Sequence, residues 1–163
     1  MSNHLEALNT NHNLSNFDCG SPALNQWLQT IASQHHNKML SRTFVVTSGA
    51  TPDVLGYYAL ALRGLVASTT LPPQLAKRLP LNIPAITLAR LAVSLDAQGQ
   101  RIGEELLVDA LRRAKQTALQ VGGAFIFVDA KDATAAAFYD HYGFVALPDN
   151  PLVLCMKILD IPD

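Results

Sequence analysis

The sequence predicts an α/β fold in which a mixed sheet carries helices on both faces. Short apolar runs typical of strands alternate with stretches in which apolar residues recur at helical spacing. The length of 163 residues fits one domain with a full hydrophobic core, expected to span residues 1–163. An apolar fraction of 49% against 15% charged residues excludes a disordered chain.

Charge and cysteine content narrow the functional classes. Twelve basic and thirteen acidic residues give a net charge of −1, so a nucleic-acid partner would need a local basic patch. Cys19 and Cys155 lie far apart without metal-ligand spacing, which predicts reduced thiols and no metal site. No apolar run approaches the roughly 20 residues that span a bilayer, and the polar N-terminus lacks a signal pattern. We therefore expect a cytoplasmic protein without membrane contact.

The first third of the chain predicts a strand, a helix and a hairpin. Residues 4–8 suit a short edge strand, and a helix is expected over 22–36 because Ser21 and Pro22 form a typical helix start. His35 and His36 near its end are interpreted as a solvated helix terminus, with a wall of a substrate site as the alternative. Strands are expected over 42–47 and 54–62, with Gly56 as a bulge or tight contact.

The middle of the chain contains the unit around which the rest is organised. An irregular stretch, 63–81, is expected to hold one short helix at 73–79, and a buried strand follows over 86–93. A turn with the sequence Gln98-Gly-Gln-Arg-Ile-Gly103 leads into an amphipathic helix over 101–119, which ends at Gly122-Gly123. Free N–H groups at a helix start after a glycine turn make an anion site suited to phosphate, although many such turns bind nothing.

The C-terminal third completes the sheet. Strands are expected over 124–129, 142–147 and 152–159, and a short helix over 133–141. Phe138 and Phe144 are interpreted as core aromatic residues. Tyr139 lies near the end of that helix, and its phenol, with an ordinary pKa near 10, is protonated at neutral pH.

Two motifs resemble those of the GNAT superfamily of N-acetyltransferases. Residues 98–103 resemble its Q/R-x-x-G-x-G/A acyl-CoA pyrophosphate loop, with Arg101 in place of the usual middle glycine, and 135–144 resemble its A-x-x-F-Y-x-x-x-G-F segment. The resemblance implies a mostly antiparallel central sheet splayed at an acetyl-CoA site. It also implies that Tyr139 protonates the departing CoA thiolate. The implied cofactor-binding residues are Leu91, Ala92, Val93, Gln98, Gly99, Gln100, Arg101, Ile102, Gly103 and Phe138.

Further motifs resemble the toxin branch of this superfamily, whose members are paired with ribbon-helix-helix antitoxins. The matching segments are F-x-C-G-x-x-x-L-x-x-W-L at 17–28, R-T-x-V-V at 42–46, G-Y-Y-A-L at 56–60 and L-A-R-L-A-V at 88–93. The resemblance implies acetylation of the α-amino group of aminoacyl-tRNA, a homodimer and an antitoxin partner. The α-amine of an aminoacyl ester is less basic than a lysine amine, so the reaction needs no dedicated base. A backbone N–H near 91–93 is the expected oxyanion donor.

A tRNA substrate needs electropositive surface, and a few basic residues are candidates. The expected substrate-binding residues are Lys38, Arg42, Arg78 and Arg90, with Lys77 and Lys131 as additions. Arg90 has an alternative role as the structural partner of a carboxylate. Arg112, Arg113 and Lys115 are interpreted as a solvated helix face.

Two other functions stay open at this point. The chain could acetylate a small amine or a protein N-terminus, which the balanced net charge favours. It could also be a non-catalytic module that binds CoA, which the arginine at position 101 keeps open.

Overall fold

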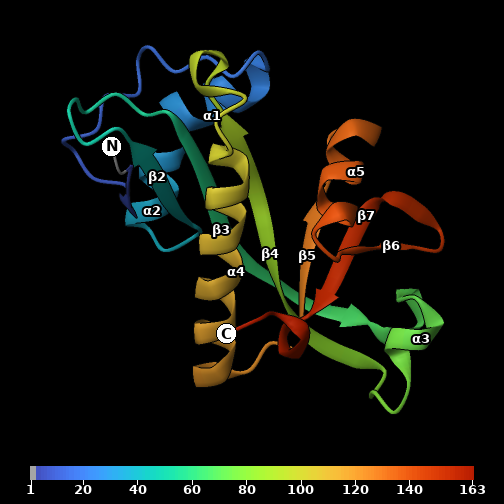
Figure 1. Ribbon diagram of the computed structural model, residues 1–163. Helices are drawn as coiled ribbons and strands as arrows, with labels where there is room; N and C mark the ends of the chain where they lie inside the picture. The colour runs from blue at the N-terminus through green and yellow to red at the C-terminus, as the bar shows by residue number, and fades with distance from the viewer. Residues whose placement is uncertain (1–2) are drawn as a thin grey trace. The chain divides into compact units, whose positions relative to one another are not determined.

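The computed structural model describes residues 3–163, and its strands form one seven-stranded mixed sheet (Figure 1). Their order is β1-β2-β3-β4-β5-β7-β6. β4 pairs with β5 in parallel, whereas the β1/β2, β2/β3, β5/β7 and β6/β7 pairs are antiparallel. The strands are β1 His4–Ala7, β2 Arg42–Thr47, β3 Gly56–Ala67, β4 Asn82–Val93, β5 Phe125–Asp129, β6 Val145–Leu147 and β7 Asn150–Lys157. The predicted mixed sheet is confirmed.

The helices follow the predicted order along the chain. They are α1 Pro22–Thr30, α2 Ala32–Asn37, α3 Pro73–Ala76, α4 Ile102–Val121 and α5 Ala133–His141, with 3-10 turns η1 Ser68–Thr70, η2 Leu95–Ala97 and η3 Ile158–Asp160. Within residues 3–163, no helix combines the length and the apolar character needed to cross a membrane.

The chain divides into two compact units, which are described separately. Unit 1 contains the chain up to Ala61 together with Ala89–Ala110, and unit 2 contains Leu62–Leu88 and Leu111–Asp163. β3, β4 and α4 each contribute residues to both units.

Unit 1 has helices on both faces of its strands, as predicted. On one face, Trp27 and Leu28 of α1 share a core with Val45 of β2 and Tyr57 of β3. On the other face, the Tyr58 hydroxyl donates a hydrogen bond to the Asp109 carboxylate of α4. The two faces follow from the alternation of side chains along β3, in which neighbouring tyrosines point in opposite directions.

Unit 2 has its own core, to which the segment connecting β3 and β4 contributes. Leu71 and the half-buried Leu75 of α3 pack with Phe125 and Phe127 of β5 and with Cys155 of β7. Burial raises the pKa of the Cys155 thiol to about 11, and both cysteines are free, as predicted. A thiol with this pKa stays protonated and serves as an apolar packing group.

The helix expected over 22–36 is wrong as a single element. It starts as predicted, since Ser21 Oγ accepts from the Leu24 amide at 3.4 Å, but it breaks at Ile31, whose φ is −120°. After the break, His36 is buried and its Nδ1 accepts the Thr43 amide of β2 at 3.0 Å. The interpretation of His36 as a solvated terminus is therefore wrong, because a long-range contact re-aims the second helix.

Several boundaries also differ from those predicted. β3 runs to Ala67, and β4 already begins at Asn82, because each of these long strands hydrogen-bonds a neighbour in the sheet. α3 ends at Ala76 and not at residue 79. The bounds of β2 and α5 agree with the predicted bounds, and Gly122 and Gly123 end α4 with φ values of 90° and 138°.

Candidate active site

One candidate functional feature is the turn between β4 and α4 in unit 1. The Gln98 side-chain amide donates to the carbonyl of Val93 at 3.1 Å, which ties the turn to the end of β4. The carbonyl of Arg101 accepts from the Glu105 amide at 3.1 Å, so α4 hydrogen bonding begins there. The amides of Ile102 and Gly103 lie ahead of that first bond, and a helix has no acceptors of its own for such groups.

This turn has the shape of an anion cradle. Gly99 has a φ of 84°, and a Cβ placed on it would meet no atom within 4 Å, so the space beside its backbone is open. The helix dipole adds a partial positive charge at the same end of α4. The residues present therefore fit the diphosphate of a nucleotide-type cofactor.

The strand leading into the turn offers a second feature. Within the described residues, the parallel pairing of β4 with β5 covers Ala85–Leu88, and β4 continues beyond it through Leu91, Ala92 and Val93. Across residues 3–163, the β4–β5 register does not include these three residues. A strand whose neighbour ends early presents N–H donors to a ligand or to a developing oxyanion.

Close packing fixes the start of α4 in unit 1. A Cβ added to Gly56 would lie 3.0 Å from Leu106, 3.1 Å from the Ala92 carbonyl oxygen and 3.2 Å from Ile102. Ile102 and Leu106 are buried. Gly56 is therefore a tight contact, one of the two roles predicted for it, and it sets how closely the helix start approaches β3 and β4.

Arg101 occupies the glycine position of the loop in a left-handed conformation, with a φ of 63°. A non-glycine residue in this region is strained by roughly 1–2 kcal/mol, partly offset by the greater freedom of glycine in the unfolded chain. We expect Arg101→Gly to raise the free energy of unfolding by roughly 0.5–1 kcal/mol in urea titrations.

Two other residues provide the comparison for this substitution. Met39 and Arg78 have φ values of 62° and 64°, so Met39→Gly and Arg78→Gly test the same strain away from the loop. A loss of stability in Arg101→Gly alone would mean that the arginine side chain stabilises the loop by contacts that outweigh its backbone strain.

A separate candidate feature is α5 in unit 2, beside β7 in Figure 1. The Asp132 carboxylate accepts from the Ala135 amide at 2.8 Å and caps the helix start. Tyr139 is 6% exposed, and its ring makes edge contacts with Phe138 at 5.2 Å and Phe144 at 5.6 Å. Within residues 3–163, no group hydrogen-bonds to the Tyr139 hydroxyl.

Burial raises the pKa of Tyr139 above its ordinary value of 10. The sequence-based expectation of an ordinary phenol pKa is therefore corrected upward. The phenol therefore stays neutral through the whole physiological range, which is the protonation state of a proton donor. Phe138 is half-buried and contacts both Tyr139 and Tyr142, so it acts at least as a packing partner of the tyrosine.

Arg90 resolves one alternative that the sequence left open. Its guanidinium carbon lies 4.7 Å from the centre of the Trp27 ring, and its Nη1 donates to the Ala89 carbonyl at 3.0 Å. Among the described residues, no carboxylate pairs with Arg90. The structural pairing with a carboxylate is therefore wrong, and a stacked guanidinium keeps donors for an anion.

The other predicted substrate-binding residues have different surroundings. Arg42 donates from Nη1 to the His36 carbonyl at 2.9 Å, so it partly serves to hold the end of α2. Lys38 is exposed directly after α2 in unit 1. Arg78 is exposed in unit 2, as are Lys77 and Lys131.

Lys115 has contacts that differ from those expected from the sequence, and two further residues have contacts that the sequence did not predict. Lys115 does not belong to a solvated face, because its Nζ donates to the Ile161 carbonyl and the Asp163 carboxylate, both at 2.7 Å. Asp109 accepts from Tyr58. Trp27 stacks on Tyr57 and supports Arg90. A lone tryptophan in one segment and a lone arginine in an apolar strand are the signals that point to this pair.

The described residues offer no candidate metal centre. Across residues 3–163, no group of three or more histidine, cysteine, aspartate or glutamate side chains is placed to hold a metal ion.

Comparison with known proteins defines the class. The GNAT acetyltransferase domain family matches residues 79–153, which include the β4–α4 turn and Tyr139. A tRNA-acetylating toxin of Mycobacterium tuberculosis is 37% identical over 147 residues, covering 90% of this chain and 87% of that protein. The chain belongs to the GNAT family of acetyltransferases, in its branch of toxin–antitoxin toxins. It is an N-acetyltransferase.

Solved structures agree with this assignment. AtaT complexed with acetyl-methionyl-tRNAfMet has a TM-score of 0.90 and 31% identity, covering 98% of this chain and 97% of AtaT. A tyrosine-to-phenylalanine mutant of the AtaT toxin, bound to the C-terminus of the antitoxin AtaR and acetyl-CoA, has a TM-score of 0.83 and 31% identity. That comparison covers 98% of this chain and 95% of the mutant chain.

Proposed function

We propose that this protein transfers the acetyl group of acetyl-CoA to the α-amino group of aminoacyl-tRNA and thereby blocks translation. The observation that carries the proposal is the open, glycine-containing turn at the start of α4, in a chain similar to a tRNA-acetylating toxin over 90% of its length. Support for the substrate comes from AtaT, which was solved with acetyl-methionyl-tRNAfMet.

The proposed cofactor contacts use the backbone of one loop. Amides of Gln98, Gly99, Gln100, Arg101, Ile102 and Gly103 hold the diphosphate of acetyl-CoA, and the peptide groups of Leu91, Ala92 and Val93 hold the arm and the acyl carbonyl. Phe138 contributes apolar surface. When bound, acetyl-CoA supplies an acetyl group activated as a thioester.

Tyr139 is the proposed general acid. Burial keeps its hydroxyl protonated, and the hydroxyl has no hydrogen-bond partner in residues 3–163 that would hold the proton back. Loss of the thiolate leaving group is assisted when a neutral phenol donates a proton to the sulfur. The attacking α-amine is already partly neutral at pH 7, so no side chain is assigned as its base.

The direct test is acetylation of charged tRNA. Total aminoacyl-tRNA incubated with radiolabelled acetyl-CoA and the protein should become labelled, and mild alkali should release the label as N-acetyl amino acids. Deacylated tRNA should stay unlabelled. Labelling of a small amine or of protein N-termini, with no labelling of aminoacyl-tRNA, would favour the small-substrate alternative.

Acetyl-CoA binding has a separate readout. A ligand that binds only the folded protein raises the free energy of unfolding by about 2.7 kcal/mol at 100 times its Kd. We expect acetyl-CoA to raise the melting temperature in a concentration-dependent way. No shift at millimolar acetyl-CoA would contradict the cofactor assignment, whatever the acetyl acceptor.

The proposed contacts to the tRNA are Arg90, Arg42, Lys38 and Arg78. Of these, Arg90 is the best candidate anchor for a phosphate, because its guanidinium stacks on Trp27. Arg90→Gln keeps a polar side chain but removes the charged guanidinium that stacks on Trp27. A lost charge-assisted hydrogen bond of about 1.5 kcal/mol corresponds to a roughly tenfold rise in KM for aminoacyl-tRNA. The slope of log K against log salt should fall by about 1.

Arg112 offers a matched control for this prediction. It is an exposed arginine on α4, and Arg112→Gln should change neither KM nor the salt slope by more than a small fraction. Equal effects of the two substitutions would show that Arg90 contributes only general charge. A KM for acetyl-CoA that rises together with the KM for tRNA would assign Arg90 to the cofactor.

The remaining proposals concern the biological setting. We propose that residues 1–163 act as a single acetyltransferase domain, that the active form is a homodimer, and that it works in the cytoplasm, where aminoacyl-tRNA is found. A ribbon-helix-helix antitoxin is the proposed regulatory partner, supported by the AtaT structure with the C-terminus of AtaR. Light scattering during gel filtration tests the dimer.

A further inference from the structure

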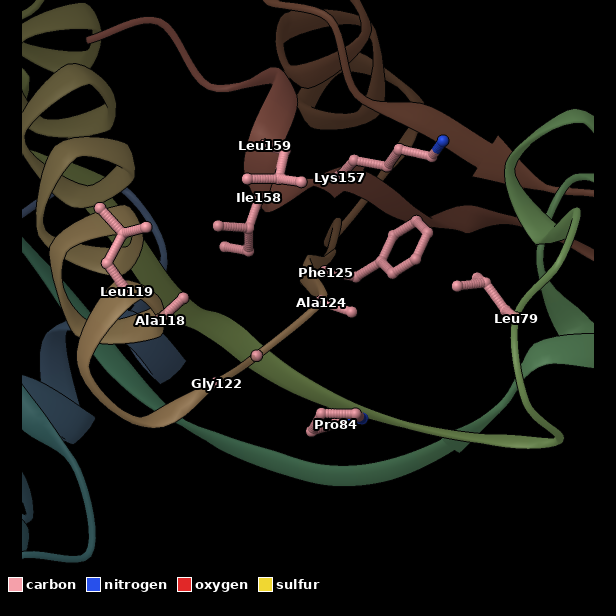
Figure 2. Close-up of a pocket in the computed structure, with 11 residues that line it drawn as sticks. Leu79, Pro84, Ala118, Leu119, Gly122, Ala124, Phe125, Lys157, Ile158 and Leu159 are labelled. Carbon is pink, nitrogen blue, oxygen red and sulfur yellow. The ribbon is translucent and has the colours of Figure 1, made fainter.

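Unit 2 contains an apolar pocket that the proposed chemistry does not use (Figure 2). Its volume is about 360 Å³, and its walls come from the end of α4, the start of β5 and η3. In Figure 2 the side chains of Leu119, Ile158, Leu159 and Phe125 surround it, with Pro84 of β4 on another side. The volume falls in the range of ligand-binding pockets, which are mostly apolar with few polar groups.

The pocket exists because the chain has no side chain to fill it. Gly122 and Gly123 turn α4 into β5, and both have left-handed φ values. A Cβ on Gly123 would lie 3.3 Å from Ile86 and 3.5 Å from Ala118, so only glycine permits this close turn. The backbone side of the depression is therefore set by this connection.

Large apolar side chains stand exposed at the pocket and beside it in sequence. Leu119 and Leu159 line it with 68% and 79% of their surface exposed, and Leu81 and Val121 are also exposed. Single exposed leucines are normal, but a group of them around a concave apolar site marks an interaction surface. A small molecule inside the pocket would leave most of this apolar surface in water.

The charges around the pocket are mainly positive. Lys157 lines it, and no carboxylate pairs with this lysine among residues 3–163. Figure 2 shows its nitrogen extended past Phe125, away from Leu159. Lys77 and Arg78 are exposed immediately before the lining residue Leu79, and Asp160 after Leu159 is the acidic residue next to the lining in sequence.

We infer that this pocket docks a segment of a partner protein, the antitoxin. That segment carries apolar anchors at helical spacing together with carboxylates. A helix laid into an apolar groove uses residues at i, i+3, i+4 and i+7, and the cations then pair with acids beside the anchors. The inference rests on the proposed function only in naming the antitoxin as the source of the segment. AtaT, solved with the C-terminus of its antitoxin, shows that a relative receives a peptide segment.

The test uses the full-length protein and a phage-displayed library of 16-residue peptides. Peptides selected on the wild-type protein are synthesised and measured by fluorescence anisotropy against three variants. Leu159→Glu places a carboxylate at the pocket, and Lys157→Gln removes its cation. Leu62→Glu is the matched control, because Leu62 is also 79% exposed in unit 2 but does not line the pocket.

The expected peptides carry leucine or phenylalanine at helical spacing and a net negative charge. We expect Leu159→Glu to weaken their binding roughly tenfold or more, Lys157→Gln to weaken it less and to reduce its salt dependence, and Leu62→Glu to leave it unchanged. Equal binding to wild type and Leu159→Glu would overturn the inference, as would selected peptides that are basic or lack apolar anchors.

Self-association of this chain and failure of the proposed function each give a distinct result. One outcome is that the wild type is a dimer, that Leu159→Glu is a monomer, and that no selected peptide binds the two differently. In that case the pocket is an interface between copies of this chain, and the inference is wrong. Acetylation of aminoacyl-tRNA is measured on the same samples. Its absence with intact peptide binding rejects the proposed function and leaves the docking site standing, while the reverse result rejects the docking site alone.

Discussion

Tyr139→Phe should lower kcat for acetyl transfer by at least 100-fold while leaving the fold unchanged. General acid catalysis contributes on the order of 10²–10⁴ in rate, and phenylalanine removes the only proton that this side chain can donate. The hydroxyl has no hydrogen-bond partner within residues 3–163, so its removal leaves no unpaired buried group there. KM for acetyl-CoA should change little.

Tyr57→Phe supplies the contrasting control. The Tyr57 hydroxyl donates to the Leu24 carbonyl at 2.8 Å, so its removal should lower the free energy of unfolding by about 1 kcal/mol and leave kcat within a few-fold of wild type. Single-turnover acetylation and urea titration of both variants separate catalysis from stability. A kcat for Tyr139→Phe within a few-fold of wild type would show that the phenol is not the acid.

The pH dependence of the wild type carries the same information. Burial raises the pKa of Tyr139 above 10, so its neutral donor form is fully present below pH 10 and is lost only at higher pH. The rate should therefore show no alkaline decline from this residue in the neutral and mildly alkaline range. A rate that falls by tenfold between neutral pH and pH 9, and does not do so in Tyr139→Phe, would mean that the pKa of the phenol lies well below its ordinary value.

Gly56→Val should produce the second large effect, on stability and on cofactor binding together. Its Cβ would lie within 3.0–3.2 Å of Leu106, the Ala92 carbonyl oxygen and Ile102, and two of these contacts belong to the first turns of α4. Overpacking of a close contact costs about 1–3 kcal/mol, and the helix start must move to relieve it. We expect a lower melting temperature and a reduced thermal shift with acetyl-CoA.

Ala61→Val tests whether any added bulk on β3 has this effect. Ala61 is half-buried on the same strand, and valine there should leave the acetyl-CoA shift intact. If Gly56→Val lost stability but kept its full shift with acetyl-CoA, the position of the α4 start would not control the cofactor site. If it kept both, the close contact at Gly56 would not constrain the structure.

Much of the fold and part of the site could be predicted from local signals. The Ser21–Pro22 cap, the strand at 42–47 and the helix at 133–141 depend on residues within a few positions of one another, and the structure confirms them. The strand–turn–helix unit around Gly99 is local in the same sense. Resemblance to the GNAT family added the identity of the ligand, which periodicity alone does not contain.

Other features depend on residues far apart in the chain. The helix breaks at Ile31 in a structure where His36 accepts a hydrogen bond from Thr43 of β2. Arg90 stacks on Trp27, 63 positions earlier, in place of the carboxylate partner that was one of its two expected roles. The low exposure that raises the pKa of Tyr139 is likewise a property of the folded chain.

The sequence by itself determined the order and type of the elements, the glycine-containing turn before the long helix and the tyrosine near the end of the helix at 133–141. These follow from capping, periodicity and backbone freedom, which act between near neighbours. Tertiary structure alone decided the left-handed backbone of Arg101, the support under Arg90 and the apolar pocket beside Gly122. The reason is that packing brings together side chains whose separation along the chain carries no information about their contact.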